Sequence, residues 1–446
     1  MEKDLTKGSV FKNLVVFSVP FLLSYLLQTL YGLADLFIIG QFGLVADTTA
    51  VSIGSQVMHM ITVILVGLAM GATVLIGRAV GAKDYDLKNR AVGNTFTAFI
   101  LVSIILMGIL MLCCDGIVDI MSTPDEALLG TKTYLFICFA GIPFITVYNV
   151  IGSVFRGMGD SKSPMYFVII ACICNISLDY LFIGGLGFGP AGAALGTTIS
   201  QAISVIVAFF AIRKKEMIRG IKRTHFVPDG AVIKNIFKVG IPVAAQDGFI
   251  QVSFIMITVF ANMRGLSDSA AVGVVEKLIG ILFLVPSTLL QSVSALCSQN
   301  IGAGREERAR QTLYDALLIA VGCGVFFAIL FQFIAPQAVG LFTNDAEVIT
   351  LGTQYMKSYV WDCIFAGIHF MFSGYFCALN KSYLSFLHNV ISAFLVRIPL
   401  AYYFSVNYES LYPMGFSAPI GSLVSVGICL LAFFVLYKKD KRNHAV

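Results

Sequence analysis

One motif occurs twice in this chain, first as Gly77-Arg-Ala-Val-Gly-Ala-Lys-Asp84 and, 221 residues later, as Ser298-Gln-Asn-Ile-Gly-Ala-Gly-Arg-Glu306. Other pairs keep an offset of 221 or 222: Pro20 matches Pro242, and residues 155–161 match residues 376–382. The 446 residues are therefore predicted to contain two copies of one plan, residues 1–222 and 223–446. The boundary is predicted in the longest polar loop, from Arg213 to about Lys238.

The composition indicates a membrane protein. Hydrophobic residues make up 58% and charged residues 12%, whereas soluble domains have about 25% charge. Twelve apolar runs have about the 20 residues needed to cross the hydrocarbon core, and short alternating strand patterns are absent, which favours helices. The first run is too long for a cleaved signal. The predicted runs are 14–40, 51–77, 93–114, 133–155, 165–184, 191–212, 237–262, 272–298, 312–334, 355–379, 384–405 and 417–437.

The predicted fold is an all-α integral membrane protein with two six-helix bundles related by a parallel repeat, because six spans per copy preserve orientation. With the N-terminus inside, 25 of the 30 Lys and Arg residues lie in cytoplasmic segments, and only Lys132 and Arg264 lie in outer loops. The positive-inside rule then places both termini in the cytoplasm of a cell-membrane protein. The net charge of +5 reflects this topology and gives no indication of nucleic-acid binding. The ten scattered cysteines are interpreted as packing residues.

Acidic residues inside spans are candidates for function because a charge in hydrocarbon costs several kcal/mol. Asp35 on the first span and Asp179 on the fifth both lie about 7–8 Å from the outer end, at about 1.5 Å per residue. Asn175 lies one turn before Asp179 on the same face, and Thr197 on the sixth span lies at a similar depth. This oxygen set suits a small cation such as Na⁺, or a proton shared by the two carboxylates. The alternative is a pair with a buried base, but the predicted spans of residues 1–222 contain no Lys or Arg.

The same helices carry further polar residues. Gln28, Tyr31 and Asp35 are spaced by three and four residues, so they share one face of the first span. Gln201 extends the Thr197 face by one turn. We interpret Gln28, Tyr31 and Gln201 as substrate contacts. Pro20 removes a backbone hydrogen bond and predicts either a hinge or a static kink in the first span.

These residues carry a family resemblance. The pattern Pro20…Gln28-Thr-Leu-Tyr31…Asp35-x-x-x-x-Gly40-x-x-Gly43 resembles the first helix of multidrug and toxic compound extrusion (MATE) transporters. Asn175-x-x-x-Asp179 and Thr197 resemble the fifth and sixth helices of their DinF-like branch. Gly81-Ala82, Gly302-Ala303 and Arg156-Gly-Met-Gly-Asp160 fit the same family, and the resemblance covers the whole chain.

The resemblance implies a V-shaped pair of six-helix bundles that exchanges inward cation flow for drug efflux, with no cofactor beyond the coupling ion. It implies Na⁺ or H⁺ binding at Asp35, Asn175, Asp179 and Thr197, and bending at Pro20 after protonation. The NorM-like branch carries a Glu on the seventh helix where Ile250 stands. The expected partners are a small-molecule drug or metabolite and the lipid bilayer, and the protein is expected to be a monomer.

The second copy differs chemically from the first. Ile257, Val396 and Leu400 occupy the positions that match Asp35, Asn175 and Asp179. Asp247 and Arg397 lie near mid-membrane and are predicted to form a buried ion pair, with a substrate or second coupling role as the alternative. Glu276 and Lys277 are predicted to open the eighth span. His59 and His369 are interpreted as hydrogen-bonded core histidines, with titration as the alternative.

Three functions remain open. The first is a cation-coupled antiporter (Na⁺ or H⁺) that exports amphipathic, often cationic drugs or metabolites by alternating access. The second is a lipid-linked oligosaccharide flippase of the same superfamily, which would favour basic residues lining the cavity. The third is a carrier of the major facilitator type, whose usual loop motif does not fit residues 81–90. An enzyme or primary pump is not expected because there is no phosphate-binding loop motif.

Overall fold

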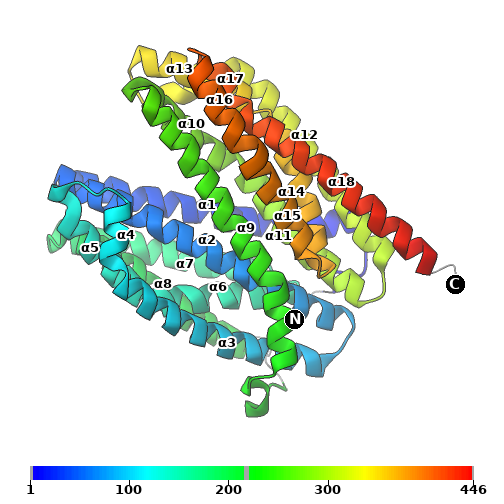
Figure 1. Cartoon of the computed structure of the whole chain (residues 1–446). Coiled ribbons are helices and arrows are strands. Elements are labelled where there is room, and N and C mark those ends of the chain that lie inside the picture. Colours follow the sequence, from blue (N-terminus) through cyan, green and yellow to red (C-terminus); the bar gives the residue numbers. More distant parts are fainter. Residues whose placement is uncertain (1–3, 215–219, 444–446) are drawn as a thin grey trace. The chain divides into compact units, whose positions relative to one another are not determined.

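A computed structural model describes residues 4–214 and 220–443, and these residues are almost entirely helical, with no strand among them (Figure 1). Ten of the described helices are long and apolar enough to cross a membrane, or twelve when two bent helix pairs are each counted as one span. The prediction of an all-α membrane protein with twelve transmembrane helices is therefore confirmed. The ten cysteines are all free.

The chain forms two compact units, which are described separately. Unit 1 contains residues 1–7, 15–240 and 298–304, and unit 2 contains residues 8–14, 241–297 and 305–446. Most of each unit comes from one copy of the repeat. Residues 298–304, which carry most of the second copy of the duplicated motif, belong to unit 1.

The helices of the first half run from residue 10 to residue 226. α5 and α6 form one broken span with a bend of 50°, because Gly141 and then Pro143 interrupt the hydrogen-bond ladder. The elements are α1 (Val10–Phe42), α2 (Val45–Gly81), α3 (Tyr85–Leu112), α4 (Cys114–Ile120), α5 (Asp125–Ala140), α6 (Ile142–Gly157), α7 (Lys162–Asp179), the π-helix η1 (Tyr180–Gly185), α8 (Gly189–Lys214) and the short 3-10 helix η2 (Arg223–Phe226).

The helices of the second half repeat this order. α13 and α14 form the second broken span, bent by 43°. The elements are α9 (Gly230–Arg264), α10 (Leu266–Leu282), α11 (Leu284–Gly302), α12 (Glu306–Gly340), α13 (Ala346–Tyr359), α14 (Asp362–Ala378), α15 (Ser382–Val390), the π-helix η3 (Ile391–Arg397), α16 (Ile398–Asn407), α17 (Leu411–Gly415) and α18 (Ser417–Asn443).

One boundary of the second half differs from the sequence prediction. Residues 266–302 form one membrane-length helical segment, so Glu276 lies in the middle of α10 and does not open a helix. The predicted span began at residue 272 because the polar residues Ser267 and Asp268 precede the apolar run. Those residues fit the first turn of a helix, where an acidic side chain is favourable.

The duplicated motif forms a close helix crossing within unit 1. A Cβ atom built on Gly81, at the end of α2, would lie 1.9 Å from the carbonyl oxygen of Gln299. A Cβ atom on Gly302, at the end of α11, would lie 2.1 Å from the carbonyl oxygen of Arg78. Each copy of the motif therefore presents its glycine to the backbone of the other copy. Gln299 adds hydrogen bonds to this crossing, since its Nε2 donates to the carbonyl oxygen of Gly157 at 3.0 Å and its Oε1 accepts from the amide of Leu5 at 3.2 Å.

A second glycine crossing joins α2 to the first turns of α9, also within unit 1. A Cβ atom on Gly71 would lie 1.9 Å from the carbonyl oxygen of Ile236, and one on Gly240 would lie 2.2 Å from that of Leu68. Glycine is required at such positions because only a residue without a side chain lets two backbones approach this closely. α2 is therefore fixed at two separate points.

Asp229, directly before α9, is held in place by hydrogen bonds. Asp229 accepts from the amides of Ala231 and Val232 and forms an ion pair with Arg90 at 3.1 Å. These two backbone hydrogen bonds and the Arg90 guanidinium lower the pKa of the Asp229 carboxyl group. The charged residue thus caps the N-terminus of α9 and attaches it to α3.

We expect Gly81→Ala and Gly302→Ala to destabilise the protein strongly, because a methyl group would overlap a carbonyl oxygen of the neighbouring helix. Overpacking of this kind costs about 1–3 kcal/mol. The melting temperature of the purified protein measures the effect. Gly108→Ala is the matched control, since Gly108 also lies within a helix and has open space around it. Equal melting temperatures for all three variants would show that the crossing is not this tight.

Candidate functional site

The two acids of the first half lie in the interior of unit 1. Asp35 on α1 is 6% exposed, whereas Asp179 at the end of α7 is 0% and Asn175 is 1% exposed. Asp179 immediately precedes the π-helix η1, a distortion that is frequent at functional sites because it changes the direction of side chains. α7 packs closely against α8, which carries Thr197.

The structure brings the four predicted cation-site residues together. The side chains of Asp179, Thr197 and Asn175 surround the carboxyl group of Asp35. The Thr197 hydroxyl donates a hydrogen bond of 3.4 Å to Asp35 Oδ2. The depth argument from the sequence, which aligned α1 with α7, agrees with this geometry.

Most of the polar atoms in this cluster have no partner in the described part of the chain. They are Asp35 Oδ1, both carboxylate oxygens of Asp179, and the amide oxygen and nitrogen of Asn175. Leaving a buried polar group without a hydrogen bond costs about 1–3 kcal/mol, and more if it is charged. The cluster is therefore stabilised by anything that brings positive charge, such as a proton or a hard cation bound by oxygen atoms.

The ligand set is limited to oxygen atoms. Among residues 4–214 and 220–443, no three His, Cys, Asp or Glu side chains converge on a metal-sized site. Two carboxylates, one amide and one hydroxyl are ligands that suit hard cations rather than zinc or copper.

Gly196 on α8 provides the space for the Asp179 carboxylate. A Cβ atom at residue 196 would lie 2.1 Å from Asp179 Oδ1. Residue 196 is therefore a glycine because a side chain there would overlap the Asp179 carboxylate. Sequence reasoning missed Gly196, although its neighbour Thr197 was singled out.

We expect Gly196→Ala to destabilise the protein by about 1–3 kcal/mol through this overlap. In an Asp179→Ala background the carboxylate is gone, so the same substitution should cost at least about 0.5 kcal/mol less, the lower end of couplings between touching residues. Thermal denaturation of the four proteins in this cycle measures the coupling. Gly32→Ala on α1, where a methyl group meets open space, is the control. Purely additive effects would contradict the geometry.

Of the predicted substrate residues, Gln28 and Tyr31 precede Asp35 on α1, and Gln201 lies on α8. Tyr31 lies next to Asp35 and Gln201. Gln28 lies next to Tyr148 of α6 and lines a cavity with it. Tyr148 was not predicted, because a single tyrosine in an apolar span gives no sequence signal.

Pro20 lies within the continuous helix α1. The hydroxyl of Ser24 donates to the carbonyl oxygen of Pro20 at 2.9 Å, so one carbonyl near the proline has a side-chain donor. The role of Pro20 as a hinge stays a prediction.

A buried basic residue does lie in a span of the first half, contrary to the prediction. α6 extends to Gly157, so Arg156 lies in its last turn rather than beyond the span, and it is only 6% exposed. The first half therefore does contain a buried base. Arg156 does not pair with Asp35 or Asp179, however, because its guanidinium group contacts Ser153 and Phe21 instead.

The predicted ion pair between Asp247 and Arg397 is wrong. Arg397 pairs with Asp362 of α14, with 3.1 Å between Nη2 and Oδ2, and Asp362 is completely buried. Asp247 instead accepts a weak hydrogen bond of 3.4 Å from the neighbouring Gln246. Arg397 is the last residue of the π-helix η3, which changes the face on which the side chain emerges.

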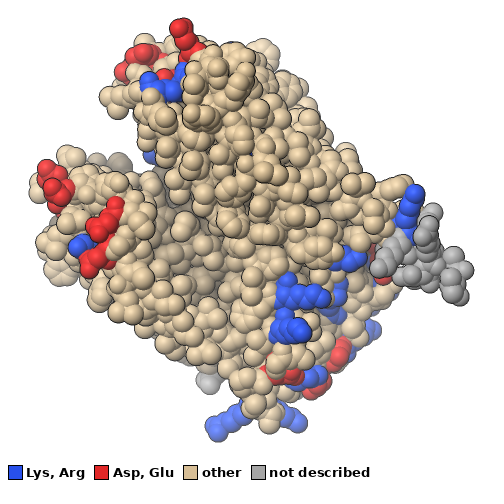
Figure 2. Space-filling view, in the orientation of Figure 1, with Lys and Arg blue, Asp and Glu red and all other residues tan. Residues whose placement is uncertain are grey.

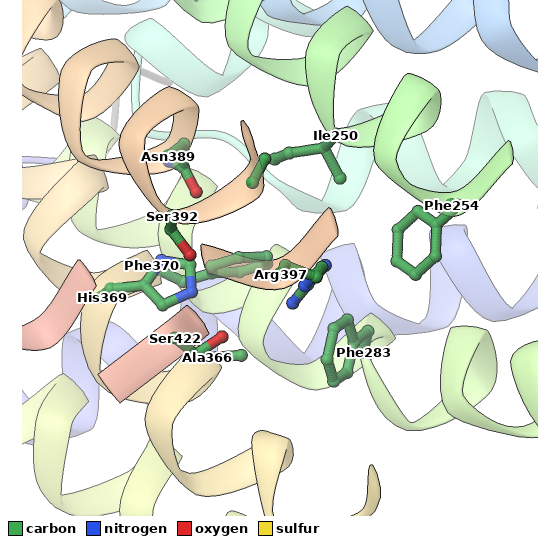
Figure 3. A pocket seen from close by; sticks show the side chains of 11 residues that line it. Ile250, Phe254, Phe283, Ala366, His369, Phe370, Asn389, Ser392, Arg397 and Ser422 are labelled. Carbon is green, nitrogen blue, oxygen red and sulfur yellow. The ribbon is translucent and has the colours of Figure 1, made fainter. Parts of the chain in front are cut away.

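Arg397 also lines a cavity within unit 2. The cavity is enclosed mainly by aromatic and polar side chains, and Ile250 lies at its edge (Figure 3). His369 is buried there, and its ring lies 5.4 Å from that of His388, which contacts the hydroxyl of Ser373.

The interpretation of His59 as a core residue is wrong, since this residue on α2 is exposed.

We expect Arg397→Met or Asp362→Leu alone to destabilise unit 2 by about 3–5 kcal/mol, because each leaves an uncompensated buried charge. The double variant should recover most of this loss, because two apolar side chains replace the pair. Chemical or thermal denaturation measures the three values. Lys277→Met removes an exposed cation from α10 and should change stability by no more than about 0.5 kcal/mol. A double variant as unstable as the single ones would argue against the pair.

Comparison with known proteins places this architecture in a class of multi-pass membrane transporters. The MatE family model matches residues 20–181 and 242–403, one match in each half. The chain therefore belongs to the MatE family.

Its relatives include "Probable multidrug resistance protein YoeA" of Bacillus subtilis (strain 168), which is 26% identical over 440 residues, covering 97% of this chain and 94% of YoeA. "Multidrug export protein MepA" of Staphylococcus haemolyticus (strain JCSC1435) is 26% identical over 441 residues, covering 98% of this chain and 95% of MepA. The solved structure "Crystal structure of MATE in the straight conformation" has a TM-score of 0.91 at 21% identity and covers 98% of both chains. It shows the same fold.

Proposed function

We propose that this protein is an antiporter of the cell membrane that couples the entry of Na⁺ or H⁺ to the export of amphipathic, often cationic drugs or metabolites. The observation that carries the proposal is the cluster of Asp35, Asp179, Asn175 and Thr197, in which five buried polar atoms have no partner within the described residues. A bound proton or cation supplies the missing positive charge.

Relatives of the chain support the choice of substrate class. Two of them, over nearly the full length of this chain, are named for multidrug resistance or multidrug export. Arg156 and Arg397 each line a cavity, as the flippase alternative would favour, but the relatives above are named for multidrug resistance or export, and we therefore propose drug export. As a transporter, the protein binds a small molecule and the lipid bilayer, acts as a monomer, and requires no cofactor other than the coupling ion.

Competition is the simplest coupling between cation and substrate. Tyr31 lies near Asp35 and contacts Gln201, so a substrate bound at these two residues lies within reach of the Asp35 carboxylate. A proton or Na⁺ at Asp35 and Asp179 then weakens the attraction for a cationic substrate. Linkage requires that the substrate weaken cation binding by the same factor. Alternating access lets this exchange take place from either side of the membrane.

The charge distribution supports cytoplasmic termini, although residues 1–3 and 444–446 lie outside the described residues. On unit 1, Figure 2 shows Lys and Arg gathered around the start of α9 and Asp and Glu at the opposite end, near α4 and α5. The acidic end carries Asp115, Asp119, Asp125 and Glu126. Positive charge marks the cytoplasmic side, so the start of α9 faces the cytoplasm in this proposal.

We expect Asp35→Asn and Asp179→Asn to abolish cation-driven export, because an amide cannot accept the coupling proton and binds a cation less strongly. The measurement is efflux of ethidium from proteoliposomes under a pH gradient alone and then under a Na⁺ gradient alone. The gradient that drives wild-type efflux identifies the ion.

The matched control is Asp47→Asn, because Asp47 caps the N-terminus of α2 by accepting from the amide of Leu44 at 2.9 Å. An asparagine can accept the same hydrogen bond, so this variant should transport normally. Asp247→Asn then tests whether coupling is confined to the first half. Full gradient-driven efflux by both Asp35→Asn and Asp179→Asn would contradict the assignment.

A further inference from the structure

A cavity in unit 1 contains a positive charge that the coupling site does not use. Its walls come mainly from α1, α6 and α7, with Val66 of α2, and they include four aromatic rings and two side-chain amides as well as a guanidinium group. The polar and aromatic lining residues include Phe21, Tyr25, Gln28, Tyr148, Asn149 and Arg156.

The guanidinium group of Arg156 is held in one position. Its Nη2 donates a hydrogen bond of 2.7 Å to the hydroxyl of Ser153, and its Cζ lies 5.0 Å from the centre of the Phe21 ring. Gly152 makes room for it, since a Cβ atom at residue 152 would lie 3.1 Å from Nη1. Arg156 is thus oriented by a hydroxyl, a ring face and a glycine, which is typical of a binding group rather than a mobile surface side chain.

No acid in the described part of the chain neutralises this charge. In residues 4–214 and 220–443, no carboxylate lies within ion-pair distance of Arg156, and its Nε is buried without a hydrogen-bond partner. Arg397, the buried arginine of unit 2, has Asp362 as its partner. The carbonyl groups at the end of α6 favour a cation by well under the cost of a desolvated charge. Arg156 therefore has the donors and the charge to bind an anion in this cavity.

We propose that this cavity binds an anionic group of the transported molecule, a carboxylate or a phosphate, at Arg156. The guanidinium supplies planar donors that match either group. Phe21, Tyr25 and Tyr148 provide aromatic surface for the rest of the molecule, and Gln28 and Asn149 provide amides. The substrates of this protein then include amphipathic molecules that carry an acidic group, in addition to purely cationic ones.

The face of α1 links this cavity to the coupling site. Gln28 lines the cavity and lies seven residues before Asp35, or about 10 Å along the helix. A molecule of ordinary drug size, anchored at Arg156 by its acidic group, extends along this face toward Tyr31. That the bound molecule is a transported substrate rests on the proposed function. Equilibrium binding without any gradient tests it separately from cation coupling.

The test uses two fluorescent probes that share one cationic ring system. Rhodamine B carries a free carboxylate, and rhodamine B ethyl ester does not. Fluorescence anisotropy with the full-length protein in phosphatidylcholine nanodiscs should show about tenfold tighter binding of the acid, the factor expected for a charge-assisted hydrogen bond. Arg156→Gln should lose this preference and bind the two probes with similar affinity. Arg156→Lys keeps the charge without the planar donors and should retain part of the preference.

Wild-type protein alone also decides the question if Arg156→Gln does not fold. Sodium benzoate should displace rhodamine B, whereas benzamide, which has the same ring without the charge, should not. Addition of phosphatidylglycerol to the nanodiscs distinguishes the source of the anion, since competition by this lipid assigns the site to a phosphate headgroup. Equal wild-type affinities for the two probes, or a preference that survives in Arg156→Gln, would overturn the proposal. If Asp35→Asn loses gradient-driven transport but still binds rhodamine B more tightly than its ester, this result supports the anion site at Arg156 independently of the cation site.

Discussion

At residues 81 and 302 two helix backbones touch, and they can do so only because neither residue has a Cβ atom. The two contacts are reciprocal: Gly81 meets the carbonyl oxygen of Gln299, and Gly302 meets that of Arg78. The reciprocity follows from the duplication, since the same motif provides both the glycine and the carbonyl that it meets. The crossing fixes the end of α2, and Gly71 fixes its middle against α9. α2 in turn packs against α5 and α6, and so anchors the bundle that encloses Asp35 and Asp179.

The duplication built two similar frames with different polar interiors. Where the first half has Asp35, the second has Ile257, which is completely buried in an apolar cluster. The second half concentrates its polar groups elsewhere, in the pair of Arg397 and Asp362. A paired arginine and aspartate neutralise each other, whereas two adjacent aspartates require a cation or proton. The same frame thus holds a closed ion pair in one unit and a cluster of two acids in the other, to which we assign cation or proton binding.

Much of this could be predicted from residue depth. The distance of a residue from the end of its span follows from the helical rise, and for Asp35, Asp179 and Thr197 that sufficed to predict one cluster. Depth does not determine which way a side chain points. For this reason the prediction that Arg397 pairs with Asp247 was wrong. Asp247 and Asp362 both lie in membrane-length helical segments, so depth alone allows either as the partner. The choice depends on the π-helix η3, since each inserted residue rotates the following residues by about 100° relative to a regular helix. No periodic pattern in the sequence records such an insertion. The glycines at 152 and 196 were missed for a related reason, because their role depends on side chains from other helices or turns.

The interior of unit 1 therefore holds charges of both signs without bringing them into contact. Asp35 and Asp179 lie in one cluster, and Arg156 lies toward the other end of the same face of α1, against Phe21. Fourteen residues separate Phe21 from Asp35, or about 21 Å along the helix, and at this distance a direct ion pair is excluded. Neither charge has a counter-charge among the described residues, so each would be neutralised by an ion or a molecule that binds from outside. A cation or proton would neutralise the acids, and an acidic group would neutralise the arginine. In the proposed function one buried face of α1 therefore carries the coupling-ion site at one end and the anion site at the other, and ion and substrate compete where the substrate reaches the acids.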